Sequence, residues 1–158
     1  VPDSVDAARL AASMGETAVT VSPAVSRDDG SVWVLHPRAV RAGRLEIVPE
    51  GLAASGGDAV VQLLDGPAFG SGLHPTTALC LELVDALTTA QAPPSALDVG
   101  TGSGVLALAA LRLGVPHVHA LDVDADALAE AEANARLNGL HARLTLLAGG
   151  PGDVDGAW

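Results

Sequence analysis

Residues 96–104 read Ala-Leu-Asp-Val-Gly-Thr-Gly-Ser-Gly, a short apolar run that leads into three alternating glycines. Ala96–Val99 is predicted to be a buried strand, and the apolar run Val105–Leu113 after the glycines is predicted to be a helix. Glycine is needed where a turn requires positive φ, or where a ligand approaches the backbone too closely for a Cβ. This stretch therefore predicts a strand, a ligand-binding loop and a helix in succession.

The sequence downstream repeats the alternation of strand and helix. Val118–Val123 and Leu144–Leu147 are predicted strands. The helix between them runs from about Ala125 to Leu137 and ends at Asn138-Gly139. This spacing indicates right-handed crossovers and a parallel sheet with both faces covered. We therefore expect a doubly wound α/β unit in this half of the chain.

A helix is also predicted upstream of the glycines. Pro75 suits the first helical position, and the Pro93-Pro94 pair ends the segment. Leu79, Leu83 and Leu87 recur every four residues and predict one apolar stripe against the core. Cys80 lies beside this stripe and is expected to be a small core residue.

The first 65 residues are predicted to form a mixed segment of mostly antiparallel character. Residues 4–14 indicate a short helix. The strand candidates are Thr17–Ser22, Ser31–Leu35, Arg44–Val48 and Ala59–Leu64. The predicted organisation is thus an N-terminal mixed α+β segment and linker at 1–65 and a doubly wound α/β domain at 66–158 that carries the ligand-binding loop.

Composition excludes several classes of protein. Of the 158 residues 49% are hydrophobic, which is enough for a sizeable core, and the net charge of −11 argues against a direct nucleic-acid partner. No apolar run approaches the roughly 20 residues that a membrane-spanning helix needs. The lone Cys80 excludes an intramolecular disulfide and suits the cytoplasm. His117 and His119 share one side of a strand but lack a third ligand, so no metal site is expected.

Two cofactors can use the glycine loop. Gly102–Ala107 satisfies the relaxed dinucleotide pattern GxGxxA, and Asp122 follows Gly102 by 20 residues, where an acid that binds ribose hydroxyls usually occurs. However, Asp98 would repel a pyrophosphate and would tolerate the cationic end of S-adenosylmethionine. We therefore favour S-adenosylmethionine over NAD, with a purely structural turn as the third alternative.

A resemblance to a known family rests on these residues. Asp98–Gly104 with Asp122–Asp124 resembles the first two motifs of class I methyltransferases. Residues 66–77, Gly-Pro-Ala-Phe-Gly-Ser-Gly-Leu-His-Pro-Thr-Thr, are similar to the AFGTGxHxTT signature of PrmA-type enzymes, which methylate amino groups of a ribosomal protein. Residues 132–139 fit the second helix of that family, and the resemblance spans about residues 44–148.

The resemblance implies a Rossmann-like class I methyltransferase fold, of which 66–158 is the first half and is truncated at its C-terminus. It implies that Thr77, Gly100 and Asp122 contact the cofactor, although helix capping is an alternative role for Thr76 and Thr77. The full set of candidate cofactor-binding residues is Phe69, Gly70, His74, Thr76, Thr77, Asp98, Gly100, Thr101, Gly102, Gly104, Asp122 and Val123.

The implied function is an S-adenosylmethionine-dependent protein N-methyltransferase, acting on lysine or α-amino groups of a ribosomal or other protein. Methyl transfer mainly requires alignment and exclusion of water, so no catalytic acid or base is expected within residues 1–158. A fragment of an NAD-dependent oxidoreductase and a non-catalytic cofactor-binding module are the alternatives. The sequence does not indicate an oligomeric state.

Overall fold

The structure, a computed structural model, describes residues 38–66 and 74–154, which all lie within one compact unit, Leu35–Trp158. The helix predicted at 4–14 and the strands predicted at 17–22 and 31–35 lie outside the described residues, as do Phe69 and Gly70. The boundary expected at residue 65 stays a prediction.

The parallel sheet predicted from the glycine-loop half is present. Strands β4 (Ala96–Val99), β5 (Val118–Asp122) and β6 (Leu144–Ala148) pair in parallel in the order β4-β5-β6. Helix α3 (Val105–Arg112) connects the first pair, and α4 (Ala125–Leu137) with the short 3-10 helix η1 (His141–Arg143) connects the second. The α/β class and the parallel sheet are therefore confirmed.

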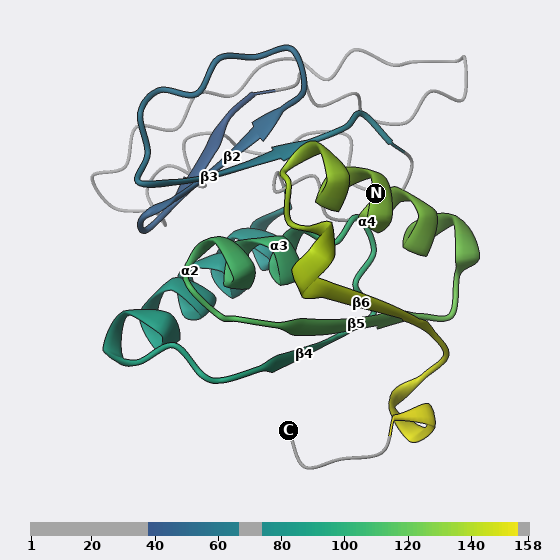
Figure 1. Cartoon of the computed structure of the whole chain (residues 1–158). Helices are drawn as coiled ribbons and strands as arrows, with labels where there is room; N and C mark the ends of the chain where they lie inside the picture. The colour runs from purple at the N-terminus through teal and green to yellow at the C-terminus, as the bar shows by residue number, and fades with distance from the viewer. Residues whose placement is uncertain (1–37, 67–73, 155–158) are drawn as a thin grey trace, which may run out of the picture. The chain divides into compact units, whose positions relative to one another are not determined.

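The helices cover one face of this sheet. Successive right-handed crossovers in one direction place α3 and α4 on the same side, as Figure 1 shows. Their face includes the buried Val118 and Ala120, whereas Val99, on the other face, is 50% exposed. In the described part of the chain, α-helices pack on one face alone. On the other face Leu121 is buried, whereas its partner Val99 is exposed, so the expectation that both faces are covered is met only in part.

A second sheet precedes α2. Strands β1 (Val40–Ala42), β2 (Leu45–Pro49) and β3 (Ala59–Leu63) lie in that order. The pairing of β1 with β2 is antiparallel, but β2 and β3 are parallel, with Leu45 opposite Ala59. The expected antiparallel character therefore holds for one of the two pairings that the structure describes.

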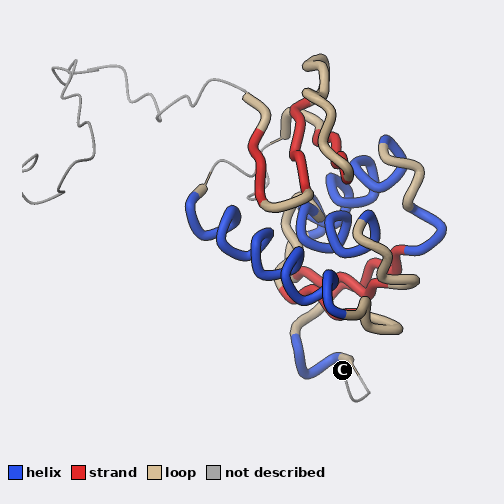
Figure 2. The backbone as a smooth tube through the Cα atoms, turned by 90° about the vertical axis from the view of Figure 1, so that its left-hand side faces the viewer, coloured by secondary structure: helices blue, strands red, loops and turns tan. Residues whose placement is uncertain are grey.

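The helices lie between the two sheets. Figures 1 and 2 both show β1–β3 on one side of the helices and β4–β6 on the other. Helix α3 contacts strands of both sheets, and its Ala107–Leu111 run is buried. A single hydrophobic core results, to which both sheets contribute. No helix among residues 38–66 and 74–154 is long and apolar enough to cross a membrane.

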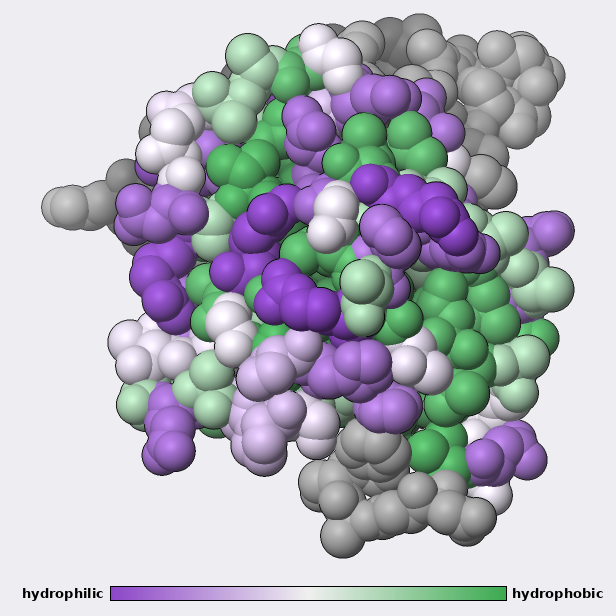
Figure 3. Space-filling view, in the orientation of Figure 1, coloured by the Kyte–Doolittle hydropathy of each residue, from purple (hydrophilic) through white to green (hydrophobic). Residues whose placement is uncertain are grey.

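Helix α2 (Pro75–Ala90) presents a different face to the core from the one predicted. Leu81 is buried and Val84 packs against the core, whereas Leu79, Leu83 and Leu87 are 65%, 59% and 63% exposed. Cys80 is also exposed, so its expected core position is wrong. Helical periodicity identified an apolar stripe, but α2 packs on α3 and β1 through the neighbouring stripe. Figure 3 shows that hydrophobic residues reach the surface between hydrophilic ones on the face that it draws.

Candidate functional site

The glycine loop joins β4 to α3 at the carboxyl end of the sheet. Gly100, Gly102 and Gly104 have φ of 72°, 55° and 82°, in the left-handed region that favours glycine. The Gly100 and Thr101 amides both donate to the Leu121 carbonyl, at 2.8 and 3.0 Å. The loop is therefore anchored to the end of β5 by its own backbone.

Gly100 and Gly104 are required for different reasons. A Cβ added at Gly104 would lie 3.1 Å from the Ala131 Cβ, so this glycine allows the loop to approach α4 closely. A Cβ added at Gly100 would meet nothing within 4 Å. The backbone at Gly100 is thus open to a ligand, whereas the backbone at Gly104 is packed against a helix.

The Asp122 carboxylate links β5 to the glycine loop. Its Oδ2 accepts from the Gly102 amide at 2.9 Å, and its Oδ1 accepts from the Asp124 amide at 3.0 Å. The Gly102 hydrogen bond, followed by the Asp124 one, lowers the pKa of Asp122. Each carboxylate oxygen has a second lone pair, and the side chain is partly exposed. Asp122 therefore keeps the capacity to accept hydrogen bonds from a diol while it holds the loop.

Asp98, near the end of β4, is in a different environment. Its Oδ2 accepts a hydrogen bond from the Thr101 hydroxyl at 2.7 Å. Burial raises the pKa of Asp98 despite this hydrogen bond, and the nearby charge of Asp122 also contributes to raising it. The two carboxylates give the loop a negative electrostatic character that favours a positively charged ligand.

A second group of candidate residues lies at the start of α2. His74 is the N-cap of this helix: its Nδ1 accepts from the Thr76 amide at 3.3 Å and lies 2.7 Å from the Thr76 hydroxyl. Thr77 is buried and Thr76 is exposed. The capping side chain is therefore His74, with Pro75 in the first turn as predicted.

The structure brings together the candidates on β4, its loop and β5. Asp98, Gly100, Thr101, Gly102 and Gly104 form one continuous turn, to which Asp122 is bonded. Val123 follows directly and is 83% exposed.

Sequence reasoning did not assign a role to Asn134 on α4. This residue is fully buried, and its side-chain amide donates to the Ser103 carbonyl at 2.9 Å. Its Oδ1 accepts from the Leu64 amide, just after β3, at 2.8 Å. A polar side chain on the buried face of an alanine-rich helix is the sequence signal that could have indicated this contact.

Two surface cavities lie away from the glycine loop. One of about 220 Å³ lies beside β6, and one of about 390 Å³ lies beside β3. Among the described residues, no group of three or more His, Cys, Asp or Glu side chains is arranged to hold a metal ion. His117 and His119 stack edge to face at 4.8 Å, and His117 Nε2 lies 2.9 Å from the Thr145 hydroxyl.

The parallel sheet and the acid-flanked glycine loop place this chain in the class I methyltransferase superfamily. Within it, the chain belongs to the ribosomal protein L11 methyltransferase (PrmA) family, whose model matches residues 7–155.

Individual relatives agree with this assignment. The chain is 47% identical over 143 residues to a ribosomal protein L11 methyltransferase of Geobacter sulfurreducens, covering 87% of this chain and 47% of the relative. It is 48% identical over 126 residues to that of Methylococcus capsulatus, covering 78% and 42%. A crystal structure of ribosomal protein L11 methylase from Lactobacillus delbrueckii subsp. bulgaricus superposes with a TM-score of 0.63 at 33% identity, covering 74% of this chain and 61% of that one. The chain thus spans less than half the length of these two curated relatives.

Proposed function

We propose that this chain binds S-adenosylmethionine and forms the cofactor-binding part of a protein N-methyltransferase. The observation that carries the proposal is the Asp122 carboxylate, which accepts a hydrogen bond from the Gly102 amide and retains acceptor capacity at the carboxyl end of the parallel sheet. An acid in this position can accept hydrogen bonds from both ribose hydroxyls and disfavours a phosphate there. The family assignment supports the same cofactor.

The roles of the individual residues follow from their positions. In this proposal the open backbone at Gly100 lies against the ligand, and Gly102 and Gly104 shape the turn. Asp98, through its charge, and Thr101, through its hydroxyl, favour the cationic amino acid end. The remaining proposed contacts are Val123, which directly follows β5, and His74, Thr76 and Thr77 at the start of α2. Phe69 and Gly70, which lie outside the described residues, are proposed contacts from the sequence alone.

The chemistry asks for positioning above all. S-adenosylmethionine, when bound, supplies a methyl group on a positively charged sulfur. The residues of this chain hold the nucleoside and the charged end in one orientation, so that an incoming amine can be aligned with the methyl carbon. The amine must arrive deprotonated, which a desolvating site favours by lowering its pKa.

The proposed acceptor is an amino group of a ribosomal protein. The support is that the relatives are ribosomal protein L11 methyltransferases. The net charge of −11 also favours association with a basic protein. A ribosomal protein substrate is consistent with a cytoplasmic enzyme, which is the proposed location.

Calorimetric titration of the chain with S-adenosylmethionine and, in parallel, with NAD tests the cofactor proposal. We expect saturable one-to-one binding of S-adenosylmethionine and much weaker binding of NAD. Tighter binding of NAD would overturn it. Incubation with purified ribosomal protein L11 and intact-mass analysis then tests transfer: a gain of one or more methyl groups supports the full proposal, whereas binding without transfer supports a non-catalytic module.

A further inference from the structure

The glycine loop is held from two sides. On the sheet side, the Gly100 and Thr101 amides donate to the Leu121 carbonyl, and the Gly102 amide donates to Asp122. On the helix side, the loop continues through Ser103 into the first turn of α3 and rests on α4. The position of the loop thus depends on α4 as well as on β5.

Asn134 supplies a polar tie on the helix side. Its Nδ2 donates to the Ser103 carbonyl at 2.9 Å, one residue before Gly104 packs on Ala131. Ala131 and Asn134 are three residues apart on α4, so they lie on the same face of the helix. The steric contact and the hydrogen bond therefore act on neighbouring residues of the loop.

The Asn134 side chain also forms a hydrogen bond at the end of β3, in the β1–β3 sheet. Asn134 Oδ1 accepts from the Leu64 amide at 2.8 Å, at the residue that follows β3. Asn134 is fully buried, so each partner that it loses is left in an apolar interior. The amide is thus a rigid bridge between the end of β3 and the glycine loop.

Asn138, one turn further along α4, provides an internal comparison. Its side-chain amide accepts from the Gln62 amide at 2.9 Å and donates to the Gln62 carbonyl at 2.7 Å. Asn138 is therefore bonded to β3 in a similar manner, but its described bonds do not reach the glycine loop. Substitutions at the two asparagines can therefore distinguish the effect of losing a bond to β3 from the effect of losing the bond to the glycine loop.

We propose that Asn134 is a positioning residue for cofactor binding, because its amide fixes the Ser103 carbonyl and hence the distance between the glycine loop and α4. The inference rests on the proposed function in that the cofactor is S-adenosylmethionine. If Asn134 served only to attach β3, its loss would affect stability alone. The proposal predicts in addition that loss of the Asn134–Ser103 hydrogen bond weakens ligand binding in the folded chain.

Asn134→Asp tests the proposal most directly. This change keeps an oxygen that can accept a hydrogen bond from the Leu64 amide. It replaces the NH2 group that donates to Ser103 by a second oxygen, which repels the Ser103 carbonyl oxygen. Asn138→Ala is the matched control, since it removes the bonds to β3 and leaves the Ser103 contact intact. Asn134→Ser, whose hydroxyl is too short to span both partners, serves if Asn134→Asp does not fold.

The measurement is calorimetric binding of S-adenosylmethionine, at a temperature where urea titration shows each variant fully folded. We expect about tenfold weaker binding for Asn134→Asp, on the scale of one hydrogen bond, and a change below about twofold for Asn138→Ala. Equal binding by Asn134→Asp and the unsubstituted chain, or equal weakening by both variants, would overturn the proposal.

Amide hydrogen exchange of the ligand-free chain gives a second readout. We expect faster exchange of the Gly104 amide, which donates to the Thr101 carbonyl at 2.9 Å, in Asn134→Asp but not in Asn138→Ala. If the unsubstituted chain binds no S-adenosylmethionine, the proposed function fails, and this exchange pattern alone decides whether Asn134 positions the loop. Unchanged exchange would contradict that role.

Discussion

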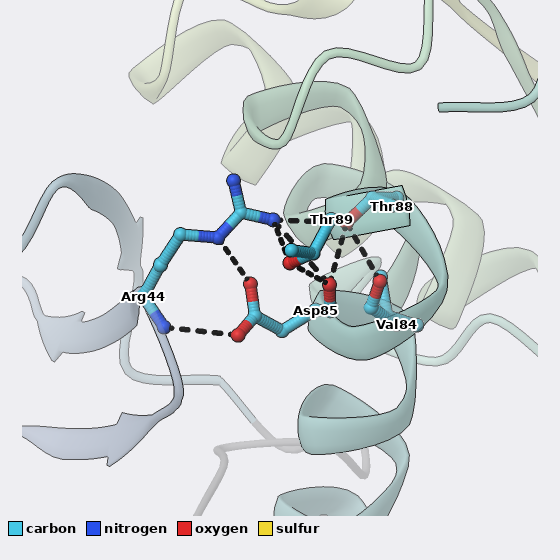
Figure 4. Close-up of polar contacts among 5 residues, drawn as sticks. All are labelled: Arg44, Val84, Asp85, Thr88 and Thr89. Atoms are coloured by element: carbon cyan, nitrogen blue, oxygen red, sulfur yellow. Dashed lines mark hydrogen bonds and ion pairs between the residues drawn. The ribbon is translucent and has the colours of Figure 1, made fainter. Parts of the chain in front are cut away.

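Arg44 and Asp85 join the β1–β3 sheet to helix α2 through side chain and backbone together. The Arg44 amide and its Nε donate to the two carboxylate oxygens of Asp85, at 3.2 and 2.7 Å, and Figure 4 shows the guanidinium reaching across the last turns of the helix. Its Nη2 also donates to the Thr89 hydroxyl at 2.8 Å. The preceding Gly43, with φ of 59°, leaves room for this contact, since a Cβ there would clash with the Asp85 carboxylate.

Arg44→Ala is expected to lower the free energy of unfolding by about 1–2 kcal/mol, because it removes a partly exposed but multiply bonded ion pair. Arg136→Ala is the control, since Arg136 pairs with Glu132 on an exposed face of α4. The control should cost at most about 0.5 kcal/mol. Urea denaturation measures both, and equal losses would contradict a special role for Arg44.

Two leucines of α2 should respond differently to truncation. Leu81 is fully buried, so Leu81→Ala is expected to cost about 2–5 kcal/mol. Leu83 is 59% exposed, so Leu83→Ala is expected to change stability by about 0.5 kcal/mol or less. Thermal and urea unfolding of the two variants test the assignment of the helix faces. A larger loss for Leu83→Ala would mean that α2 is rotated in solution.

Asp122→Ala is expected to weaken S-adenosylmethionine binding by more than about 1.5 kcal/mol, the scale of hydrogen bonds to a charged group. The change removes the proposed ribose acceptor and releases the Gly102 amide. Asp124→Ala is the control, because it removes the N-cap of α4, which accepts from the Asp126 amide. The control should lose stability, by about 1 kcal/mol, but little affinity. Calorimetry showing unchanged affinity in Asp122→Ala would count against the ribose contact.

Asp98 should make the stability of the ligand-free chain depend on pH. Burial raises its folded-state pKa above the unfolded value of 3.8, so the folded chain retains this proton to higher pH than the unfolded chain. The resulting stabilisation is full below the unfolded pKa and is lost as pH rises through the folded pKa. Asp98→Asn keeps an acceptor for Thr101 and should therefore be more stable than the unsubstituted chain at neutral pH. Urea titrations from pH 3 to 8 would refute this if Asp98→Asn were the less stable protein at pH 7.

Glu46 should have the opposite pH dependence. Hydrogen bonds from the Ser55 amide, the Ser55 hydroxyl and the Gly57 amide lower the pKa of Glu46 to about 2. Because the folded pKa is lower than the ordinary 4.5, the stabilisation is present above 4.5 and is lost as pH falls through about 2.

Glu46→Gln should accordingly be less stable than the unsubstituted chain at neutral pH, and the difference should shrink between pH 4.5 and 2. Glu50→Gln, at the exposed position directly after β2, is the control. Acid unfolding followed by circular dichroism measures both. A constant difference between Glu46→Gln and the unsubstituted chain over this range would contradict the assignment.

The elements from Ala96 to Ala148 could be predicted closely because their signals are local. Apolar runs mark β4 and β5, and α4 ends at an Asn-Gly pair. The orientation of α2 could not be predicted in this way. Leu79 and Leu83 form one apolar stripe, but the helix has a second, and periodicity does not indicate which of the two packs on α3. The parallel pairing of β2 with β3 also depends on tertiary packing.

The candidate site divides along the same line. The spacing of Gly102 and Asp122 indicated that the two residues lie close together. Gly102 lies in the loop after β4 and Asp122 ends β5, and the carboxyl ends of adjacent parallel strands meet at the same end of the sheet. The bond from Asn134 to Ser103 spans 31 residues and depends on how closely α4 approaches the loop. Single-sequence patterns carry no information about such an approach.

The paired carboxylates at the mouth of the glycine loop bear on turnover under the proposed function. Their electrical bias attracts a sulfonium more strongly than the uncharged thioether that remains once a methyl group has left. Asp98 and Asp122 would then favour binding of the methylated donor and release of the demethylated nucleoside product. The same two side chains would thus contribute to both steps.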